Sequence, residues 1–143
     1  LLGATTNIGI GYLIGRDLSF FGPARDAQWL TSPSFILGLA LFGLGFFINL
    51  QSDNILIRLR KPGESGYKIP HGGLYKYVSC PNYFGEILEW GGFALATCSP
   101  GALAFWIWTM SNLIPRAAQN HQWYLETFDD YPKERRKVIP FVF

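Results

Sequence analysis

Polar side chains recur at helical spacing inside three apolar stretches of the sequence. Residues three, four or seven apart lie near one face of a helix, so each set forms a polar stripe on an otherwise apolar rod. Such groups are costly to bury without partners, which makes them candidates for a shared site. The polar positions are Asn49, Asp53 and Arg60 in the first stretch, Asn82, Glu86 and Glu89 in the second, and Asn112, Arg116, Asn120 and Tyr124 in the third, with His121 beside them.

Together these side chains have the chemistry of a site for a large, polar, anionic ligand. Arginine binds phosphate through paired donors, while amides and tyrosine hydroxyls can bind ribose and base edges. The competing interpretation is that polar groups near the ends of membrane helices only contact interfacial water. Glu86 argues against it most strongly, because this acid lies about one turn inside an apolar helix, where an acid is a functional candidate.

The elements that must position these residues are four apolar helices. The chain has 143 residues, of which 49% are hydrophobic and only 15% are charged, a balance that favours a membrane protein. Helix openings are indicated at Ser32-Pro33, Pro81 and Ser99-Pro100. We therefore predict an all-α, multi-span transmembrane helix bundle that forms a single domain. The expected spans are residues 1–14, 33–60, 81–98 and 100–128, with a polar loop at residues 16–32.

The first expected span is shorter than the roughly 20 residues that cross a bilayer. Because the chain begins inside apolar sequence, we expect a truncated span and earlier spans that belong to the same functional unit. Basic residues gather in the loop after the second span and in the carboxy-terminal tail, which places both in the cytosol. The net charge of +2, without a continuous basic face, argues against nucleic acid as a partner.

Several isolated features are given structural interpretations. Cys80 and Cys98 lack metal-ligand spacing and are expected to be packing residues. His121 has no second histidine or carboxylate pair at ligand spacing, so no metal site is expected. Gly11 and Gly15 are four apart and are expected to let another helix approach closely, rather than to bind a dinucleotide.

Longer motifs run through most of the chain. They are Leu59-Arg60-Lys61-Pro62-Gly63-Glu64, Gly66-Tyr67-Lys68-Ile69-Pro70, Gly72-Gly73-Leu74, Asn82-Tyr83-Phe84-Gly85-Glu86, Trp123-Tyr124-Leu125 and Ile139-Pro140-Phe141-Val142-Phe143. In combination they resemble the steroid 5-alpha-reductase family, over essentially the whole chain. The resemblance implies an all-helical membrane reductase of roughly seven spans that holds NADPH between the cytosolic ends of its later spans.

The resemblance also implies a set of cofactor-binding residues. Arg60 and Arg116 are candidates for phosphate contacts, and Asn82, Glu86 and Tyr124 are candidates for ordering the ribose and nicotinamide. Some relatives carry histidine at the position of Asn120, and here a histidine follows it directly, so both residues are included. The complete candidate set is Asn49, Asp53, Arg60, Tyr67, Asn82, Glu86, Arg116, Asn120, His121 and Tyr124.

The activity that the resemblance implies is NADPH-dependent reduction of the 4,5 double bond of 3-oxo-4-ene steroids. In the family, an acid and a tyrosine that polarise the steroid carbonyl come from earlier spans, so the catalytic residues are expected upstream of this chain. The alternatives are an enoyl-CoA or polyprenol reductase, an isoprenylcysteine methyltransferase-like enzyme that uses S-adenosylmethionine, and a non-catalytic membrane scaffold. The expected location is the endoplasmic reticulum membrane or a bacterial inner membrane, in contact with lipid, with the cofactor site facing the cytosol.

Overall fold

The chain folds into four main helices. The computed structural model describes residues 2–21, 26–60 and 63–143, and this part of the chain contains no β-strand. The helices are α1 (Leu2–Arg16), α2 (Pro33–Arg58), α3 (Pro81–Thr97) and α4 (Pro100–Thr127). Each expected apolar stretch is therefore helical, with ends within two residues of the predicted ones, and the all-α prediction is confirmed.

The serine-proline pairs set two of the helix starts. The Ser32 hydroxyl accepts a hydrogen bond from the Phe35 amide at 3.2 Å, and the Ser99 hydroxyl accepts one from the Ala102 amide at 3.1 Å. A proline follows each serine at the first helical position, where its missing amide costs nothing. Helix α3 ends at Cys98, which has a φ of 48°. This left-handed residue lets the chain reverse directly into α4.

The expected loop at residues 16–32 is partly helical. Asp17–Phe21 continues α1 as a π-helical turn, and Trp29–Thr31 forms a 3-10 turn. The prediction was wrong for the first segment because it counted the charged residues, whereas positions 16–21 contain neither glycine nor proline. The glycine-proline pair at positions 22 and 23 lies outside the described residues.

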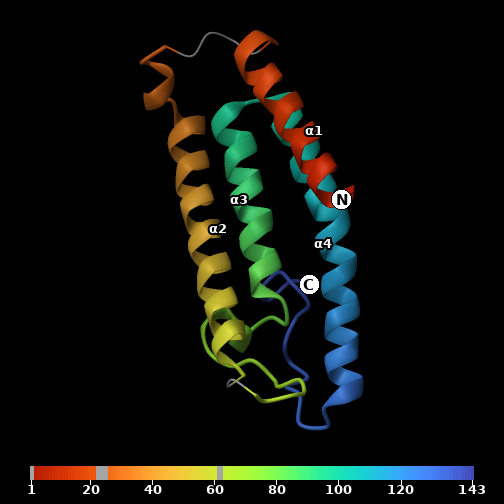
Figure 1. Ribbon diagram of the computed structural model, residues 1–143. Helices are drawn as coiled ribbons and strands as arrows, with labels where there is room; N and C mark the ends of the chain where they lie inside the picture. Colours follow the sequence, from red (N-terminus) through yellow and green to blue (C-terminus); the bar gives the residue numbers. More distant parts are fainter. Residues whose placement is uncertain (1, 22–25, 61–62) are drawn as a thin grey trace.

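Helices α2 and α3 pack antiparallel and in backbone contact (Figure 1). A Cβ atom placed on Gly45 would lie 2.4 Å from the Glu89 amide nitrogen, and one placed on Gly92 would lie 2.4 Å from the Phe42 amide nitrogen. Glycines on both helices therefore let the two rods approach closely. We call this contact the glycine seam, and its glycines are Gly38 and Gly45 of α2 with Gly85 and Gly92 of α3.

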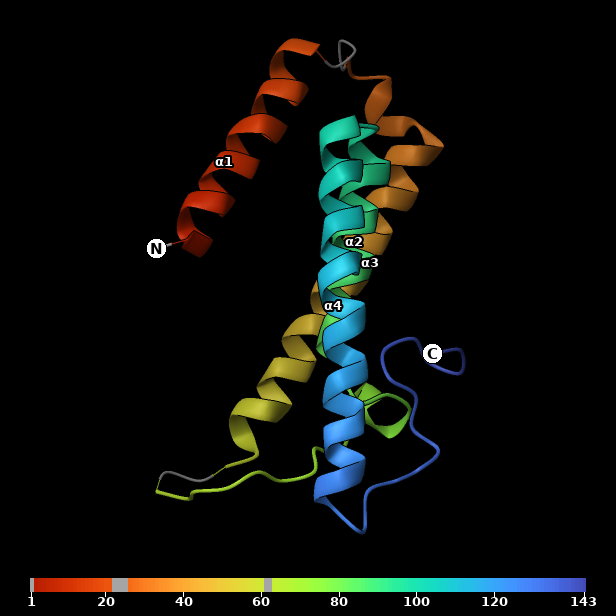
Figure 2. The same ribbon diagram turned by 90° about the vertical axis from the view of Figure 1, so that its right-hand side faces the viewer.

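The glycine pair that the sequence analysis singled out does not pack in this way. Cβ atoms placed on Gly11 and Gly15 would meet no described atom within 4 Å. Figure 2 shows why, because α1 stands apart from the layer formed by the other three helices. No helix of the described chain therefore packs closely on Gly11 and Gly15, and their contact with another helix stays a prediction.

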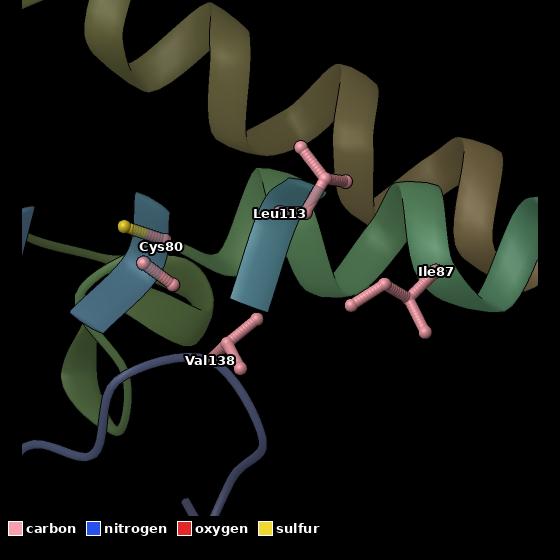
Figure 3. Close-up of a cluster of buried hydrophobic side chains, with 5 residues drawn as sticks. Cys80, Ile87, Leu113 and Val138 are labelled. Carbon is pink, nitrogen blue, oxygen red and sulfur yellow. The ribbon is translucent and has the colours of Figure 1, made fainter. Parts of the chain in front are cut away.

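Helix α4 packs against α3 on the side away from α2. The Trp106 indole nitrogen donates to the Ile87 carbonyl at 2.8 Å, which ties the middle of the two helices together. Nearer the end of the bundle, Ile87, Leu113 and Val138 belong to a buried cluster with Cys80 (Figure 3). The cluster joins α3, α4 and the tail into one core.

Among the described residues, α2 is the one helix both long and apolar enough to cross a membrane. It has 26 residues. The side chains of Leu37, Leu44 and Phe47 on its outer surface are each at least half exposed. Exposed apolar side chains along a whole helix are suited to contact with lipid rather than water. The length and the exposed apolar surface of α2 therefore support its prediction as a membrane helix.

The carboxy-terminal tail covers the end of the bundle near the start of α3 (Figure 1). Val78 and Arg136 form a parallel β-bridge, in which the Arg136 amide donates to the Tyr77 carbonyl at 2.8 Å. The Cys80 amide donates to the Lys137 carbonyl at 3.1 Å. The tail and the loop before α3 therefore form one irregular layer, which closes the end of the bundle where the predicted polar residues gather.

Candidate functional site

A cavity of about 370 Å³ opens at this end of the bundle, between the last turns of α2 and α4 and the loop that leads into α3. Its walls combine amides, hydroxyls, a thiol and aromatic rings. The lining residues are Leu56, Tyr67, Tyr75, Ser79, Cys80, Asn82, Tyr83, Asn120, Trp123 and Tyr124. Four of the ten predicted cofactor-binding residues are among them, namely Tyr67, Asn82, Asn120 and Tyr124.

Asn82 connects the cavity wall to α2. Its side-chain amide donates to the Asp53 carboxylate at 3.3 Å, and its backbone carbonyl accepts from the Asn49 amide group at 3.2 Å. Asn49 and Asp53 are four residues apart on α2, so both reach the first turn of α3 from one face. The two α2 residues predicted from spacing thus lie directly behind a lining residue and fix its orientation.

Aromatic rings and a guanidinium stand at the mouth of the cavity. Tyr67 is 66% exposed and meets Trp123 edge to face, with 4.9 Å between ring centroids. The Arg60 guanidinium carbon lies 5.3 Å from the centroid of the Tyr67 ring, a cation–π arrangement. Arg60, Tyr67 and Trp123 therefore offer one positive charge and two aromatic faces to a ligand entering from solvent.

Another part of the wall carries an amide and a thiol. The Asn120 side-chain nitrogen lies 3.5 Å from the Tyr83 hydroxyl and 3.7 Å from the Cys80 sulfur, and can donate to either. Cys80 is 4% exposed, and burial raises the pKa of its thiol to about 11. The thiol is therefore protonated at neutral pH and inert as a nucleophile. Cys80 does pack in the core, as expected, but it also forms part of the cavity.

The floor of the cavity rests on stacked tyrosines. Tyr124 stacks on Tyr131 with 5.0 Å between centroids and 9° between ring planes. The Arg135 guanidinium carbon also lies 5.0 Å from the centroid of the Tyr131 ring. Arg135 is one of the basic residues of the tail, and it is only 4% exposed. Its charge is therefore buried against Tyr131 rather than on the surface.

A hydrogen-bonded group of three side chains lies beside the stack. The Ser79 hydroxyl is 2.6 Å from the His121 Nδ1 atom and 2.6 Å from the Tyr131 hydroxyl. His121 is therefore held by Ser79 and does not line the cavity. The histidine contributes to the site by fixing the loop and tail, and a direct contact between its ring and a cofactor stays a prediction.

Glu86 and Arg116 are not brought to the cavity either. A step of four residues turns an α-helix about 40° beyond a full turn, so Arg116 is rotated about 80° from Tyr124. Arg116 is exposed on another face of α4. Glu86 is half-buried and lies about 6 Å deeper along α3 than Asn82, within electrostatic range of Asp53. Their assignment to the cofactor stays a prediction.

Sequence reasoning missed the contributions of the loop. Tyr75 and Ser79 lie in an irregular segment where no periodicity reveals which side chains face inward. Tyr75 is 1% exposed, which raises the pKa of its phenol far above the usual value. The one local signal is the Gly72-Gly73 pair, where φ values of 94° and 50° indicate a tight turn that directs the following residues.

A larger cavity, about 560 Å³, runs along α3 and α4 farther from this end. Its walls are mainly apolar side chains such as Leu41, Leu88 and Leu103. It lacks the donors that a phosphorylated ligand requires. The smaller, polar cavity is therefore the candidate site for a dinucleotide.

Comparison with known proteins agrees with the resemblance. A family model described as 3-oxo-5-alpha-steroid 4-dehydrogenase matches residues 3–143. The 3-oxo-5-alpha-steroid 4-dehydrogenase 1 of Rattus norvegicus is 54% identical over 132 residues, which are 92% of this chain and 51% of that protein. For the enzyme of the same name from Homo sapiens, identity is 50% over 133 residues, 93% of this chain and 51% of that protein. The steroid 5-alpha-reductase DET2 of Arabidopsis thaliana is 44% identical over 144 residues, 99% of this chain and 55% of that protein.

The chain thus spans about half the length of the curated relatives it matches. The matched region contains the whole polar cavity, from Arg60 and Tyr67 at its mouth to Tyr124 and the tail that supports it. On this match, the chain belongs to the 3-oxo-5-alpha-steroid 4-dehydrogenase family.

Proposed function

We propose that this chain forms the cofactor-binding part of an NADPH-dependent reductase that saturates the 4,5 double bond of 3-oxo-4-ene steroids. The observation that carries the proposal is the polar and aromatic cavity at the end of a membrane-type helix bundle. The relatives named as steroid 5-alpha-reductases support the choice of reaction and substrate class.

The residues of the cavity fit a nicotinamide dinucleotide. Trp123 and Tyr67 offer aromatic faces for a base, and Arg60 offers a guanidinium for phosphate. Asn82 and Asn120 supply amides that can bind hydroxyl and carboxamide groups, which both donate and accept. The volume of about 370 Å³ accommodates part of such a ligand, so we propose that the remainder lies along the open mouth.

The protein's share of the mechanism is positioning. NADPH, when bound, supplies the hydride. We assign to Asn82 and Tyr124 the orientation of the cofactor, because Asn82 is fixed by Asp53 and Tyr124 by its stack on Tyr131. A developing enolate oxygen needs hydrogen-bond donors near the steroid carbonyl. We place those donors in the part of the relatives' length that this chain does not match.

We also propose that α3 and α4 cross the membrane beside α2, with the cavity facing the cytosol. Basic residues cluster at the cavity end of the bundle, in agreement with the charge asymmetry of membrane proteins. The endoplasmic reticulum membrane and a bacterial inner membrane both have this cytosolic face. Surrounding lipids would contact the exposed apolar surface of α2.

The alternatives differ in what enters the site. An enoyl-CoA or polyprenol reductase would keep the same cofactor cavity and accept an acyl or prenyl chain, whereas a methyltransferase would bind S-adenosylmethionine there. A non-catalytic scaffold requires polar stripes that bind partner helices. The grouping of four predicted residues around one cavity favours a ligand-binding protein over a scaffold.

The test is transfer of labelled hydride. We expect full-length protein in membranes to move tritium from the nicotinamide C4 of NADPH to a 3-oxo-4-ene steroid and to yield the 5-alpha product. An enoyl-CoA and a polyprenol enone serve as competing acceptors, and S-adenosylmethionine with labelled methyl serves as the competing donor. Transfer to an acyl or prenyl acceptor alone would reassign the substrate, and methyl transfer without hydride transfer would overturn the reductase proposal.

A further inference from the structure

The hydroxyl of Tyr75 is an anomaly at the end of the bundle. Its oxygen is buried and has no hydrogen-bond partner in the described part of the chain. Other hydroxyls nearby do have partners: the Ser79 hydroxyl lies 2.6 Å from the Tyr131 hydroxyl, and the Asn120 amide can donate to the Tyr83 hydroxyl. A buried hydroxyl without a partner loses its hydration and gains nothing in return. Such a group needs a partner that the described residues do not supply.

The backbone holds Tyr75 rigidly. It lies in the 3-10 turn Gly73–Lys76, where the Tyr75 amide donates to the Gly72 carbonyl at 3.1 Å. Gly73 has a φ of 50°, and a Cβ atom there would lie 2.9 Å from the Gln51 side-chain oxygen. The turn therefore fits closely against α2, and the phenol cannot swing away to solvent without disrupting it.

The surroundings of the phenol indicate where its partner must come from. Tyr75 lines the polar cavity, and its hydroxyl is within electrostatic range of Cys80 and Tyr124, which line it too. Asp53 is also within range. The Asp53 carboxylate disfavours a negatively charged ligand group near Tyr75. The Arg60 guanidinium, beside Tyr67 at the mouth, favours a negatively charged group there. The deep end of the cavity therefore suits an uncharged oxygen of a ligand, and the mouth suits its phosphates.

We propose that Tyr75 is a ligand-binding residue of this cavity, whose hydroxyl donates a hydrogen bond to an uncharged oxygen of the cofactor, a ribose hydroxyl or the nicotinamide carboxamide. The inference rests on the proposed function, because it takes the occupant to be a nicotinamide dinucleotide. The hydroxyl is buried beneath the cavity surface, so the ligand reaches it when a lining side chain shifts. Tyr75 thereby orders the inner part of the cofactor while Arg60 binds the outer part.

The test is Tyr75→Phe in the full-length protein, with two readouts. Removing an unpaired buried hydroxyl should raise the melting temperature of the ligand-free protein, because a desolvated polar group is replaced by hydrogen. The same change should weaken NADPH binding by about five- to tenfold, the loss of one hydrogen bond. Binding is measured by NADPH fluorescence or calorimetry, and stability by thermal unfolding in detergent without nucleotide.

Tyr77→Phe is the matched control. Tyr77 is on the same loop and its ring packs on Phe141, but it does not line the cavity. We expect this variant to bind NADPH with unchanged affinity.

Three outcomes overturn the inference. A lower melting temperature for Tyr75→Phe would show that the hydroxyl has a structural partner, and unchanged NADPH affinity would show that the ligand does not use it. If the wild-type protein binds no NADPH at all, the proposed function fails as well. Binding by the wild type with equal affinity in Tyr75→Phe overturns the inference about Tyr75 alone.

Discussion

The glycine seam and the polar cavity lie at successive levels of the same helices and are built in opposite ways. Along the seam, Gly38 and Gly92 bring two backbones into contact, and no polar side chain is needed. At the cavity, Asn82, Asn120 and several tyrosines line a space of about 370 Å³ between the elements. The seam therefore determines how α2 and α3 are joined, whereas the cavity determines what the bundle can bind. Substitutions in the two regions should have separable effects.

The largest effect is expected at the seam, for Gly45→Ala. The new methyl group would lie 2.4 Å from the Glu89 amide nitrogen, a backbone atom that cannot move aside alone. We expect a loss of about 3 kcal/mol or more in the free energy of unfolding, at the upper end of overpacking costs. The measurement is thermal unfolding and monodispersity of the purified protein in detergent.

Gly43→Ala is the control on the same helix, because a Cβ atom there would meet nothing within 4 Å. Alanine is the better helix former, so this variant should be as stable as the wild type or slightly more stable. Equal stability of Gly45→Ala and Gly43→Ala would contradict the close approach of α2 and α3.

The sequence predicts the helices better than their packing. Ser32-Pro33 and Ser99-Pro100 carry local signals for a helix start, and local signals need no partner. The choice between Gly11 and Gly45 as a packing residue depends on which helix lies alongside, and no local pattern contains that information. The sequence analysis therefore did not identify the glycines of the seam.

The residues of the candidate site also fall into two groups, those that local sequence patterns reveal and those that depend on tertiary structure. Asn82, Asn120 and Tyr124 lie on helices, where spacing marked them as polar-stripe residues, although the same spacing also selected Glu86 and Arg116, which do not line the cavity. Tyr75 and Ser79 belong to the loop and are positioned by the tail, whose contact with Ser79 joins residues 52 apart in sequence. Helical periodicity cannot report such pairings, and burial in irregular segments is decided by tertiary structure.

The reactivity of the two cysteines reports how accessible their thiols are, at the cavity for Cys80 and at the turn between α3 and α4 for Cys98. Cys80 is buried in the cavity wall with a thiol pKa of about 11, while Cys98 is exposed at the turn between α3 and α4. At pH 7.5 a thiol of pKa about 11 has a thiolate fraction at least about 100-fold below that of an ordinary thiol, so a maleimide should modify Cys98 far faster. Alkylation of Cys80 should accelerate about tenfold for each pH unit up to its pKa.

The experiment uses two variants of the full-length protein in an otherwise cysteine-free background, one that keeps Cys80 and one that keeps Cys98. Mass spectrometry follows the rate of alkylation. Unfolding in detergent and urea should make both thiols react at similar rates. A fast reaction of Cys80 in the folded protein would contradict its burial at the cavity.

The smallest effect, and the most specific one, is expected for Asn82→Leu. Leucine has similar size but cannot donate to Asp53, so the cavity loses both a polar wall group and the link that orients it. We expect about tenfold weaker NADPH binding, which corresponds to one or two hydrogen bonds, together with a modest loss of stability. Asn54→Leu is the matched control, since Asn54 is exposed on α2 and does not line the cavity. If both variants bind NADPH equally well, the cavity is not the cofactor site. The cavity would then differ from the seam only in how closely its helices pack, and not in binding a ligand.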